Sequence, residues 1–343
     1  MPWDFTTGFA HVTDTHRAKT AAVVVTYNRK ELLDVCLESL LSQTAPLDAI
    51  YIIDNCSTDG TYDTLLSKEW IAPVADAKGE PTESIKAVKI PTRPESAVEI
   101  RYVRMPENTG GAGGFHEGVR RGCAAGFDWL WLMDDDLRAT PEAFRALVNQ
   151  REALVATRGA TFLLNSLVLA QEPSDGDTLA FPLQEIGPRG YPRIGVYYHR
   201  LSEVADKVQD GLYRWACPFN GTLIPTAAIA EIGLPNKDFF IWGDERDFLW
   251  RAAQVLDLYT VVDSRTSHPK FPGVAFNWKL YYHIRNALVI NERLNFTVLR
   301  DLKLILAGLA LGLRHGTRGL GLVGRAIKDG LTHNLGPRRD LLK

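Results

Sequence analysis

The sequence predicts an α/β fold with a mainly parallel central sheet, and three observations support this class. Short β-branched or apolar runs that are typical of strands occupy residues 21–26, 49–53 and 99–103. Segments with apolar residues at helical spacing lie between such runs, most clearly residues 30–43. Polar clusters directly follow the strands. Strands that alternate with helices favour a parallel sheet, because parallel neighbours need a crossover connection.

The elements follow in a regular order. The helix at 30–43 has one apolar face, made by Leu33, Cys36, Leu37, Leu40 and Leu41. A second helix is expected near Gly60, after the turn-forming run 54–60. Residues 71–98 lack clear periodicity and predict a surface insertion before the strand at 99–103. A helix at 116–125 and a strand at 129–133 complete this part, and residues 215–225 indicate further core.

Composition limits the domain organisation and the partners. The chain has 343 residues, 45% of them hydrophobic, and a net charge of −2, which gives no electrostatic case for nucleic acid as a partner. Four scattered cysteines without a C-x-x-C pair suggest neither a zinc site nor a disulfide framework. No secretory signal is seen, so we expect a cytoplasmic protein. We expect an N-terminal extension over 1–19, a main domain over 20–290 and a C-terminal helical region over 291–343.

The C-terminal region has two possible roles. Residues 304–313 carry no charge, but ten residues are too few to cross a bilayer, which needs about 20. Basic residues outnumber acidic ones after Leu313. An apolar helix beside basic residues predicts peripheral contact with the inner face of the cell membrane, whereas a core or oligomer helix with a solvated basic tail fits the pattern equally well.

The triplet Asp134, Asp135 and Asp136 is the strongest candidate for chemistry. It follows the apolar run 129–133, where a buried strand ends. Like charges crowded at that point need a cation, hydrogen bonds or a proton to offset their repulsion. The competing interpretation is a helix cap, but Thr140 and Pro141 already supply a helix start. The triplet therefore predicts a site for a divalent cation or a substrate.

A glycine-rich loop lies between the third strand and the next helix. Residues 107–115 contain Gly110, Gly111, Gly113 and Gly114, which let the backbone approach a phosphate or a sugar closely. The dinucleotide fingerprint G-x-G-x-x-G is not met, because His116 occupies its third glycine position. Taken alone, the glycines are equally compatible with a tight structural turn.

A second acidic cluster follows the apolar run 239–241. Part of the run 242–247 suits the N-terminus of a helix, where the dipole favours acidic side chains. A carboxylate beside an aromatic wall is also suited to act as a general base, because partial desolvation raises its proton affinity. Farther along, His268 could give a nitrogen ligand to a metal, although a lone histidine is more often structural.

Together these motifs resemble the inverting family 2 glycosyltransferases with a GT-A fold. The resemblance rests on the order and spacing of five motifs, at residues 23–29, 54–60, 108–115, 134–136 and 242–251, and covers about residues 20–290. The loop at 108–115 combined with three aspartates is most similar to the galactofuranosyltransferase branch, with rhamnosyltransferases as close neighbours.

The resemblance implies a role for each motif. Donor binding is implied for the following residues: Thr26, Arg29, Asp54, Asn55, Asn108, Gly110, Gly111, Gly113, Gly114, Asp135 and Trp242. Asp134, Asp136 and His268 would bind Mn or Mg. Glu245 matches the general base and Asp244 its acidic neighbour that contacts the acceptor. The family usually has aspartate at the base position, whereas this chain has Asp244 followed by Glu245, so which of them takes the proton stays open.

The implied function is transfer of galactofuranose from UDP-galactofuranose to a glycan or a polyprenyl-linked glycan in cell-envelope polysaccharide synthesis. The nearest alternative is a rhamnosyltransferase that uses dTDP-rhamnose. A nucleotidyltransferase is more distant, because residues 26–29 replace the glycine- and arginine-rich loop expected after its first strand. A non-catalytic glycan-binding module is the alternative outside enzymes, and the intact acidic residues argue against it.

Overall fold

The computed structural model describes residues 17–171, 175–187, 192–216, 219–270 and 275–341. Most of the expected N-terminal extension, together with Cys217, lies outside the described residues. The other three cysteines are free thiols.

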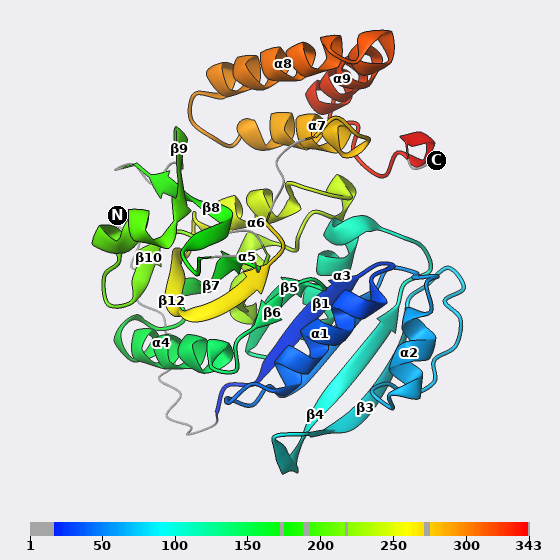
Figure 1. Ribbon diagram of the computed structural model, residues 1–343, viewed down its shortest axis with the longest axis vertical. Coiled ribbons are helices and arrows are strands. Elements are labelled where there is room, and N and C mark those ends of the chain that lie inside the picture. The colour runs from blue at the N-terminus through cyan, green and yellow to red at the C-terminus, as the bar shows by residue number, and fades with distance from the viewer. Residues whose placement is uncertain (1–16, 172–174, 188–191, 217–218, 271–274, 342–343) are drawn as a thin grey trace, which may run out of the picture.

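The first half of the described chain forms the parallel part of the central sheet (Figure 1). Strand β1 (Thr20–Thr26) lies between β5 (Trp129–Asp134) and β2 (Ala49–Asp54). Strand β4 (Arg93–Arg104) pairs with the other side of β2. These neighbours are all paired in parallel. The expected α/β fold with a largely parallel centre is therefore confirmed, and the carboxyl ends of the four strands meet at one edge.

Helices cover both faces of this sheet. Alternate residues of β1 point to opposite sides, so Val24 belongs to one hydrophobic core and Val23 to the other. The helices of the first core are α1 (Lys30–Leu41), α2 (Thr61–Ser67) and α4 (Ala143–Arg158). Those of the second core are α3 (Gly110–Ala124), α5 (Ile229–Ile232) and α6 (Asp244–Ala252). This three-layer arrangement buries β1 completely, which explains its continuous apolar sequence.

The second half of the sheet is mixed. From β5 the order continues through β11 (Thr222–Pro225), β7 (Phe162–Ala170), β12 (Asp257–His268) and β10 (Leu212–Arg214). Strand β11 is antiparallel to both β5 and β7, and β12 is parallel to β7. It follows that β12 runs in the same direction as β5. The last residue of β12, His268, therefore reaches the edge at which Asp134 ends β5.

Shorter elements complete this half. Strand β6 (Arg138–Ala139) pairs with β12, and β8 (Thr178–Ile186) forms a hairpin with β9 (Pro192–Arg200). Short 3₁₀ turns occupy η1 (Leu201–Lys207), η2 (Thr226–Ala228), η3 (Lys237–Phe239) and η4 (Arg339–Leu341).

The structure adds an edge strand to residues 71–98, in which the sequence shows no clear periodicity. Strand β3 (Thr82–Ile90) pairs antiparallel with β4 at the outer edge of the sheet, and β4 begins at Arg93 rather than at Glu99. The side chains of β3 are alternately exposed and half-buried, and each set mixes polar or charged residues with apolar ones, such as the exposed Ile85 and the half-buried Val88. Such composition protects an edge strand from aggregation, and it also removes the apolar alternation by which a strand is recognised.

The C-terminal helices form a separate layer, drawn in orange and red in Figure 1. They are α7 (Lys279–Asn291), α8 (Thr297–Leu313) and α9 (Gly316–Leu331), packed around Tyr282, Leu288 and Val323. A Cβ at Gly319 would lie 2.3 Å from the carbonyl oxygen of Gly312, so glycine allows α8 and α9 to approach closely. Within the described segments, every helix is too short or too polar to traverse a bilayer.

Candidate functional site

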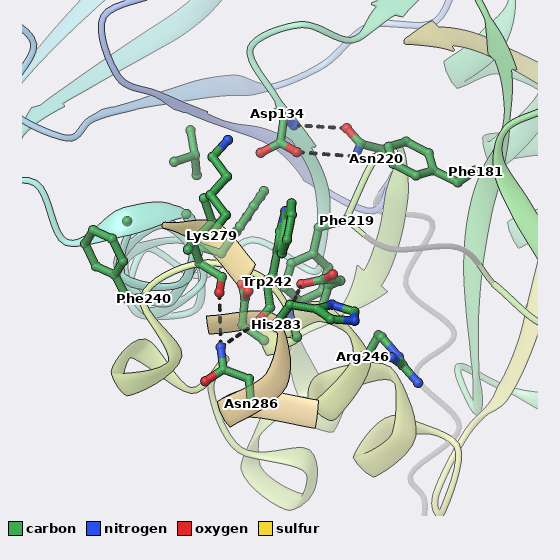
Figure 2. Close-up of a pocket in the computed structure, with 18 of the residues that line it drawn as sticks. Asp134, Phe181, Phe219, Asn220, Phe240, Trp242, Arg246, Lys279, His283 and Asn286 are labelled. Carbon is green, nitrogen blue, oxygen red and sulfur yellow. Dashed lines mark hydrogen bonds between the residues drawn. The ribbon is translucent and has the colours of Figure 1, made fainter. Parts of the chain in front are cut away.

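A cavity of about 1010 Å³ opens at the carboxyl ends of the strands. Figure 2 shows part of its lining, with Asp134, Trp242 and Asn286 brought together from β5, the turn before α6 and α7. The predicted site residues that line it are Thr26, Arg29, Asn55, Asn108, Gly110, Gly111, Asp134, Asp135, Asp136, Trp242, Asp244, Glu245 and His268. The predicted residues Asp54, Gly113 and Gly114 are not part of the lining. One cavity thus unites five motifs that are widely separated in the sequence.

Asp134, Asp136 and His268 form a possible metal centre. Their ligand atoms all lie within 4.8 Å of one another. The Nε2 atom of His268 is 2.8 Å from Oδ1 of Asp136, and both side chains are mostly buried. Two carboxylates and one imidazole suit Mn²⁺ well, and Mg²⁺ accepts the same oxygen ligands. The residues therefore fit the divalent cation expected from the sequence.

The shifted pKa values in this cluster reflect the burial of Asp134 and its repulsion by the charge of Asp136, which a bound cation would offset. Burial and the charge of Asp136 raise the pKa of Asp134 to about 7. Burial lowers the pKa of His268, but the hydrogen bond and the charge of Asp136 outweigh it, so that pKa is raised overall. A divalent cation would favour the ionised form of Asp134 and the neutral form of His268. Its binding should release protons near neutral pH.

Asp135 acts on the loop after β1 rather than on this cluster. It accepts a hydrogen bond of 2.7 Å from Oγ1 of Thr26 and one of 3.2 Å from Nη1 of Arg29. The same nitrogen of Arg29 is 2.7 Å from Asp136. Burial raises the pKa of Asp135 to about 6, although Arg29 and Thr26 favour its charged form. Asp135 and Asp136 therefore hold the guanidinium group of Arg29 in the lining of the cavity.

The glycines that the sequence predicts to lie in a loop before a helix at 116–125 form the first turns of α3 instead, and Asn55 holds the start of this helix in place. Its Nδ2 atom donates to the carbonyl oxygen of Gly110 at 3.0 Å, and its Oδ1 atom accepts from Oγ1 of Thr109 at 2.8 Å. Asn108 accepts from the amide of Gly110 at 2.8 Å. The neighbouring Asp54 is fully buried and accepts from the hydroxyl of Tyr102 at 2.6 Å, which explains its absence from the cavity wall.

The four glycines serve different purposes. Gly110 has a φ of +72°, and a Cβ there would lie 1.9 Å from the carbonyl oxygen of Phe240. A Cβ at Gly113 would meet Oγ1 of Thr109 at 2.3 Å, and one at Gly114 would meet Val25 at 2.4 Å. Only Gly111 among these four has open space around it. Close packing inside the fold therefore accounts for Gly113 and Gly114.

We expect Gly110→Ala to destabilise the protein by about 2 kcal/mol or more, because it combines an unfavourable φ with a backbone clash. Gly111→Ala is the matched control in the same helix, and it should leave stability nearly unchanged or slightly raised. Urea unfolding followed by circular dichroism measures both variants. Equal midpoints for the two variants would contradict this account of Gly110.

A strained turn carries the second acidic cluster. Phe240 and Trp242 have φ values of 66° and 62°, and Gly243 has a φ of 97°. The side-chain amide of Asn286 on α7 donates to the carbonyl oxygens of Phe239 at 3.1 Å, Ile241 at 3.0 Å and Trp242 at 2.6 Å. Figure 2 shows Asn286 beneath this turn. Residues with positive φ are held where surrounding contacts over-determine them, and Asn286 supplies these contacts.

The carboxyl groups of Asp244 and Glu245 differ in environment. Asp244 is only 4% exposed, and burial together with the charge of Glu245 raises its pKa well above the usual value. Glu245 is half-buried, and its Oε2 atom accepts from the amide of Gly243 at 3.0 Å. Asp134 also contributes to the raised pKa of Asp244, so the two acidic clusters interact across the cavity. Within the pair, burial and the interaction with Glu245 therefore favour the protonated form of Asp244.

Several lining residues have no counterpart among the sequence predictions. Asn220 donates to Oδ2 of Asp134 at 3.3 Å (Figure 2). Lys279 and His283 come from α7, and burial and Arg246 lower the pKa of His283 to about 4, which keeps its ring neutral. Trp278 and Lys279, at the start of the amphipathic helix α7, are the local sequence signal that could have indicated a role for this helix.

Comparison with known proteins gives two kinds of similarity. The sequence model of the family described as Glycosyl transferase family 2 matches residues 21–69 and 92–156. The galactofuranosyltransferase GlfT1 of Mycobacterium tuberculosis strain H37Rv is 31% identical over 250 residues, covering 72% of this chain and 69% of that protein. GlfT1 of Mycolicibacterium smegmatis is 27% identical over 236 residues, covering 67% and 64%.

Solved structures share the fold at low sequence identity. GalNAc-T7 with UDP, GalNAc and Mn²⁺ superposes with a TM-score of 0.54 at 16% identity, covering 80% of this chain and 48% of that one. Residues 1–349 of S. aureus TarS with UDP-GlcNAc give a TM-score of 0.53 at 11% identity, covering 91% and 80%. These similarities confirm the expected GT-A architecture.

Proposed function

Because this chain belongs to glycosyltransferase family 2 and is related to the galactofuranosyltransferases, we propose that it transfers galactofuranose from UDP-galactofuranose to a glycan acceptor. One observation carries the proposal. The metal cluster of Asp134, Asp136 and His268 faces the pair of Asp244 and Glu245 within a single cavity. Such a site offers one end to a diphosphate and the other to an acceptor hydroxyl.

The donor would bind at the metal end. Thr26, Arg29 and Asn55 lie at or just after the ends of the first two strands and line the cavity beside the glycine-rich start of α3. Gly111 leaves space for a phosphate or a sugar to approach the backbone. Mn²⁺ or Mg²⁺ held by Asp134, Asp136 and His268 would neutralise the charge that develops on the departing diphosphate.

Glu245 would act as the general base. It is the less buried member of the acidic pair, and burial favours the protonated form of its neighbour Asp244. The acceptor oxygen forms a bond to the anomeric carbon while the bond from that carbon to the diphosphate oxygen breaks. The electron pair of the broken bond leaves with the nucleoside diphosphate, and the acceptor proton passes to Glu245. Attack from the face opposite the leaving group inverts the anomeric configuration.

A donor screen tests the proposed function. The purified protein is incubated with UDP-galactofuranose, dTDP-rhamnose and common UDP-hexopyranoses, with Mn²⁺ or with EDTA, and release of the nucleoside diphosphate is followed. Selective, metal-dependent turnover of UDP-galactofuranose is expected. Preference for dTDP-rhamnose would reassign the chain to the neighbouring branch, and turnover that is unaffected by EDTA would refute the role of the metal.

The acceptor is proposed to be a polyprenyl-linked glycan at the inner face of the membrane. Helix α8 presents a long apolar face to solvent, in which Val298 is 82% exposed, Leu306 57% and Leu302 53%. These residues are spaced four apart and so lie on one side of the helix. Lys303, Arg314 and Arg318 lie nearby in the sequence and are exposed. An apolar stripe with adjacent basic residues suits an anionic bilayer surface.

We expect the triple variant Val298→Glu, Leu302→Glu, Leu306→Glu to lose binding to phosphatidylglycerol vesicles by at least about tenfold, since it replaces apolar area with like charge. Vesicle co-sedimentation measures this binding. The control is Ile85→Glu with Val155→Glu, which alters residues of similar exposure elsewhere. Unchanged vesicle binding of the triple variant, or a change in its oligomeric mass instead, would favour a protein interface on this face.

A further inference from the structure

Lys279 opens α7 and places a charged group in the cavity without an acidic partner. Its Nζ atom lies 5.9 Å from the ring centre of Trp242 and 5.7 Å from that of Trp278. Among the described residues, no carboxylate lies within ion-pair distance of this ammonium group. The side chain is half-buried, and burial together with Arg29 lowers the pKa of Lys279. The ammonium group is therefore partly desolvated and only weakly compensated.

The position of Lys279 relates it to the donor end of the cavity. The charged groups that influence its protonation are Arg29 and Asp136, which belong to the metal end. In Figure 2 the Lys279 side chain extends on the side where Asp134 lies, whereas Arg246 lies beyond His283. Arg246 influences His283 and Arg300 instead. Lys279 and Arg246 thus lie toward different ends of the cavity.

The donor end needs a further positive charge. A departing nucleoside diphosphate carries more negative charge than one divalent cation neutralises. Arg29 is already held by Asp135 and Asp136 at 3.2 Å and 2.7 Å, so much of its charge is balanced within the protein. Lys279 differs because its charge is not balanced by a nearby carboxylate. A phosphate oxygen would supply the missing partner through a charge-assisted hydrogen bond.

We propose that Lys279 binds the diphosphate of the donor and stabilises it as the leaving group. This inference rests on the proposed function, because it requires a nucleotide-sugar donor in the cavity. In the transfer step the bond between the anomeric carbon and the diphosphate oxygen breaks, and its electron pair stays on that oxygen. Lys279 keeps its proton throughout and interacts more strongly as negative charge accumulates there.

The alternative is that Lys279 has a purely structural role, as a cation packed on tryptophan rings. Testing it needs a control lysine that makes the same kind of contact outside the cavity. Lys68 gives one, because its Nζ atom lies 4.7 Å from the ring centre of Trp70 on the surface near α2. Lys68 also forms ion pairs with Asp34 and Glu38, so its charge is balanced inside the protein. Lys68→Met removes the same kind of lysine–tryptophan contact without touching the cavity.

The experiment measures binding of UDP and of uridine to the full chain by isothermal titration calorimetry, with Mn²⁺ and with EDTA. Lys279→Met should weaken UDP binding by about 10- to 100-fold under both conditions, which is the usual effect of losing a charge-assisted hydrogen bond. Uridine binding should stay unchanged. Lys279→Arg should restore most of the UDP affinity, and Lys68→Met should behave as the unaltered protein.

Kinetics on the same variants separate leaving-group stabilisation from ground-state binding. If Lys279 acts mainly on the developing charge, Lys279→Met lowers kcat by a larger factor than it raises KM. A variant that binds UDP as tightly as the unaltered protein would overturn the inference. So would a variant that loses UDP and uridine to the same extent, because that pattern indicates a collapsed cavity.

The outcomes also separate this inference from the proposed function. If dTDP-rhamnose proves to be the donor, the galactofuranose proposal fails, and the same titrations with dTDP and thymidine still decide the role of Lys279. If the donor is UDP-galactofuranose but Lys279→Met is indistinguishable from Lys68→Met, only the inference fails. Absence of any nucleoside diphosphate binding by the unaltered protein would overturn both.

Discussion

Asp136→Ala should abolish sugar transfer, with a loss in kcat of at least about a thousandfold. Asp136 lies at the centre of the donor end, 2.8 Å from Nε2 of His268 and 2.7 Å from Nη1 of Arg29. Its removal takes away one of three ligand groups for the cation and frees Arg29 from its strongest partner. Steady-state kinetics with the preferred donor and titration of Mn²⁺ into the protein measure the two consequences.

The fold should tolerate this replacement. Asp136 follows β5 rather than lying within it, and its charge contributes to the raised pKa of Asp134. Loss of that repulsion offsets part of the stability that is lost with the contacts from Asp136 to His268 and Arg29, which lower the pKa of Asp136, so the unfolding temperature should fall only slightly. Asp257→Ala is a suitable control. The Asp257 carboxylate forms an exposed ion pair with Arg158, and neither residue lines the cavity. Substantial residual turnover by Asp136→Ala, with Mn²⁺ binding retained, would refute the metal assignment.

Glu245→Gln should lower kcat by about 10²- to 10⁴-fold, the usual contribution of a general base, while UDP binding stays unchanged. The amide keeps the size of the side chain but cannot accept the acceptor proton. Asp244→Asn should have a smaller effect, because burial and Glu245 already favour the protonated form of Asp244, and an amide can likewise donate to Glu245. Transfer rates and UDP affinities of both variants give the comparison.

The reverse order of effects would contradict this assignment. If Asp244→Asn removes transfer and Glu245→Gln retains most of it, the buried aspartate takes the proton. The order Asp-Glu departs from the usual family pattern, so this pair of variants resolves a question that sequence alone leaves open.

The sequence predicts those parts of the site that come directly after apolar strands. Asp134 and Asp136 are recognisable because the β5 sequence is a continuous apolar run, which makes three carboxylates at its end conspicuous. The acidic pair of α6 was recognised for the same reason, behind the apolar residues 239–241. In an open parallel sheet such positions converge at the carboxyl edge, so their convergence can be predicted without knowing the register between strands.

Other features depend on contacts between distant segments. The glycines at 110 and 113 share one loop motif, but only the structure shows that Gly110 makes room for Phe240 and Gly113 for Thr109. Asn286 and Lys279 lie on an amphipathic helix with no recognisable motif, and their roles follow from how α7 packs against the turn before α6. The edge strand β3 is not predicted, because each of its faces mixes polar and apolar side chains and this hides the period of two.

The three hydrogen bonds from Asn286 have a practical consequence for enzymology. Helix α7 provides one wall of the cavity and also packs against α8 and α9 in the C-terminal layer. A chain shortened after residue 296 would leave much of α7 without its packing partners and would loosen the turn that carries Glu245. Such a shortened enzyme should be inactive even toward a water-soluble acceptor, so its failure would reveal nothing about lipids.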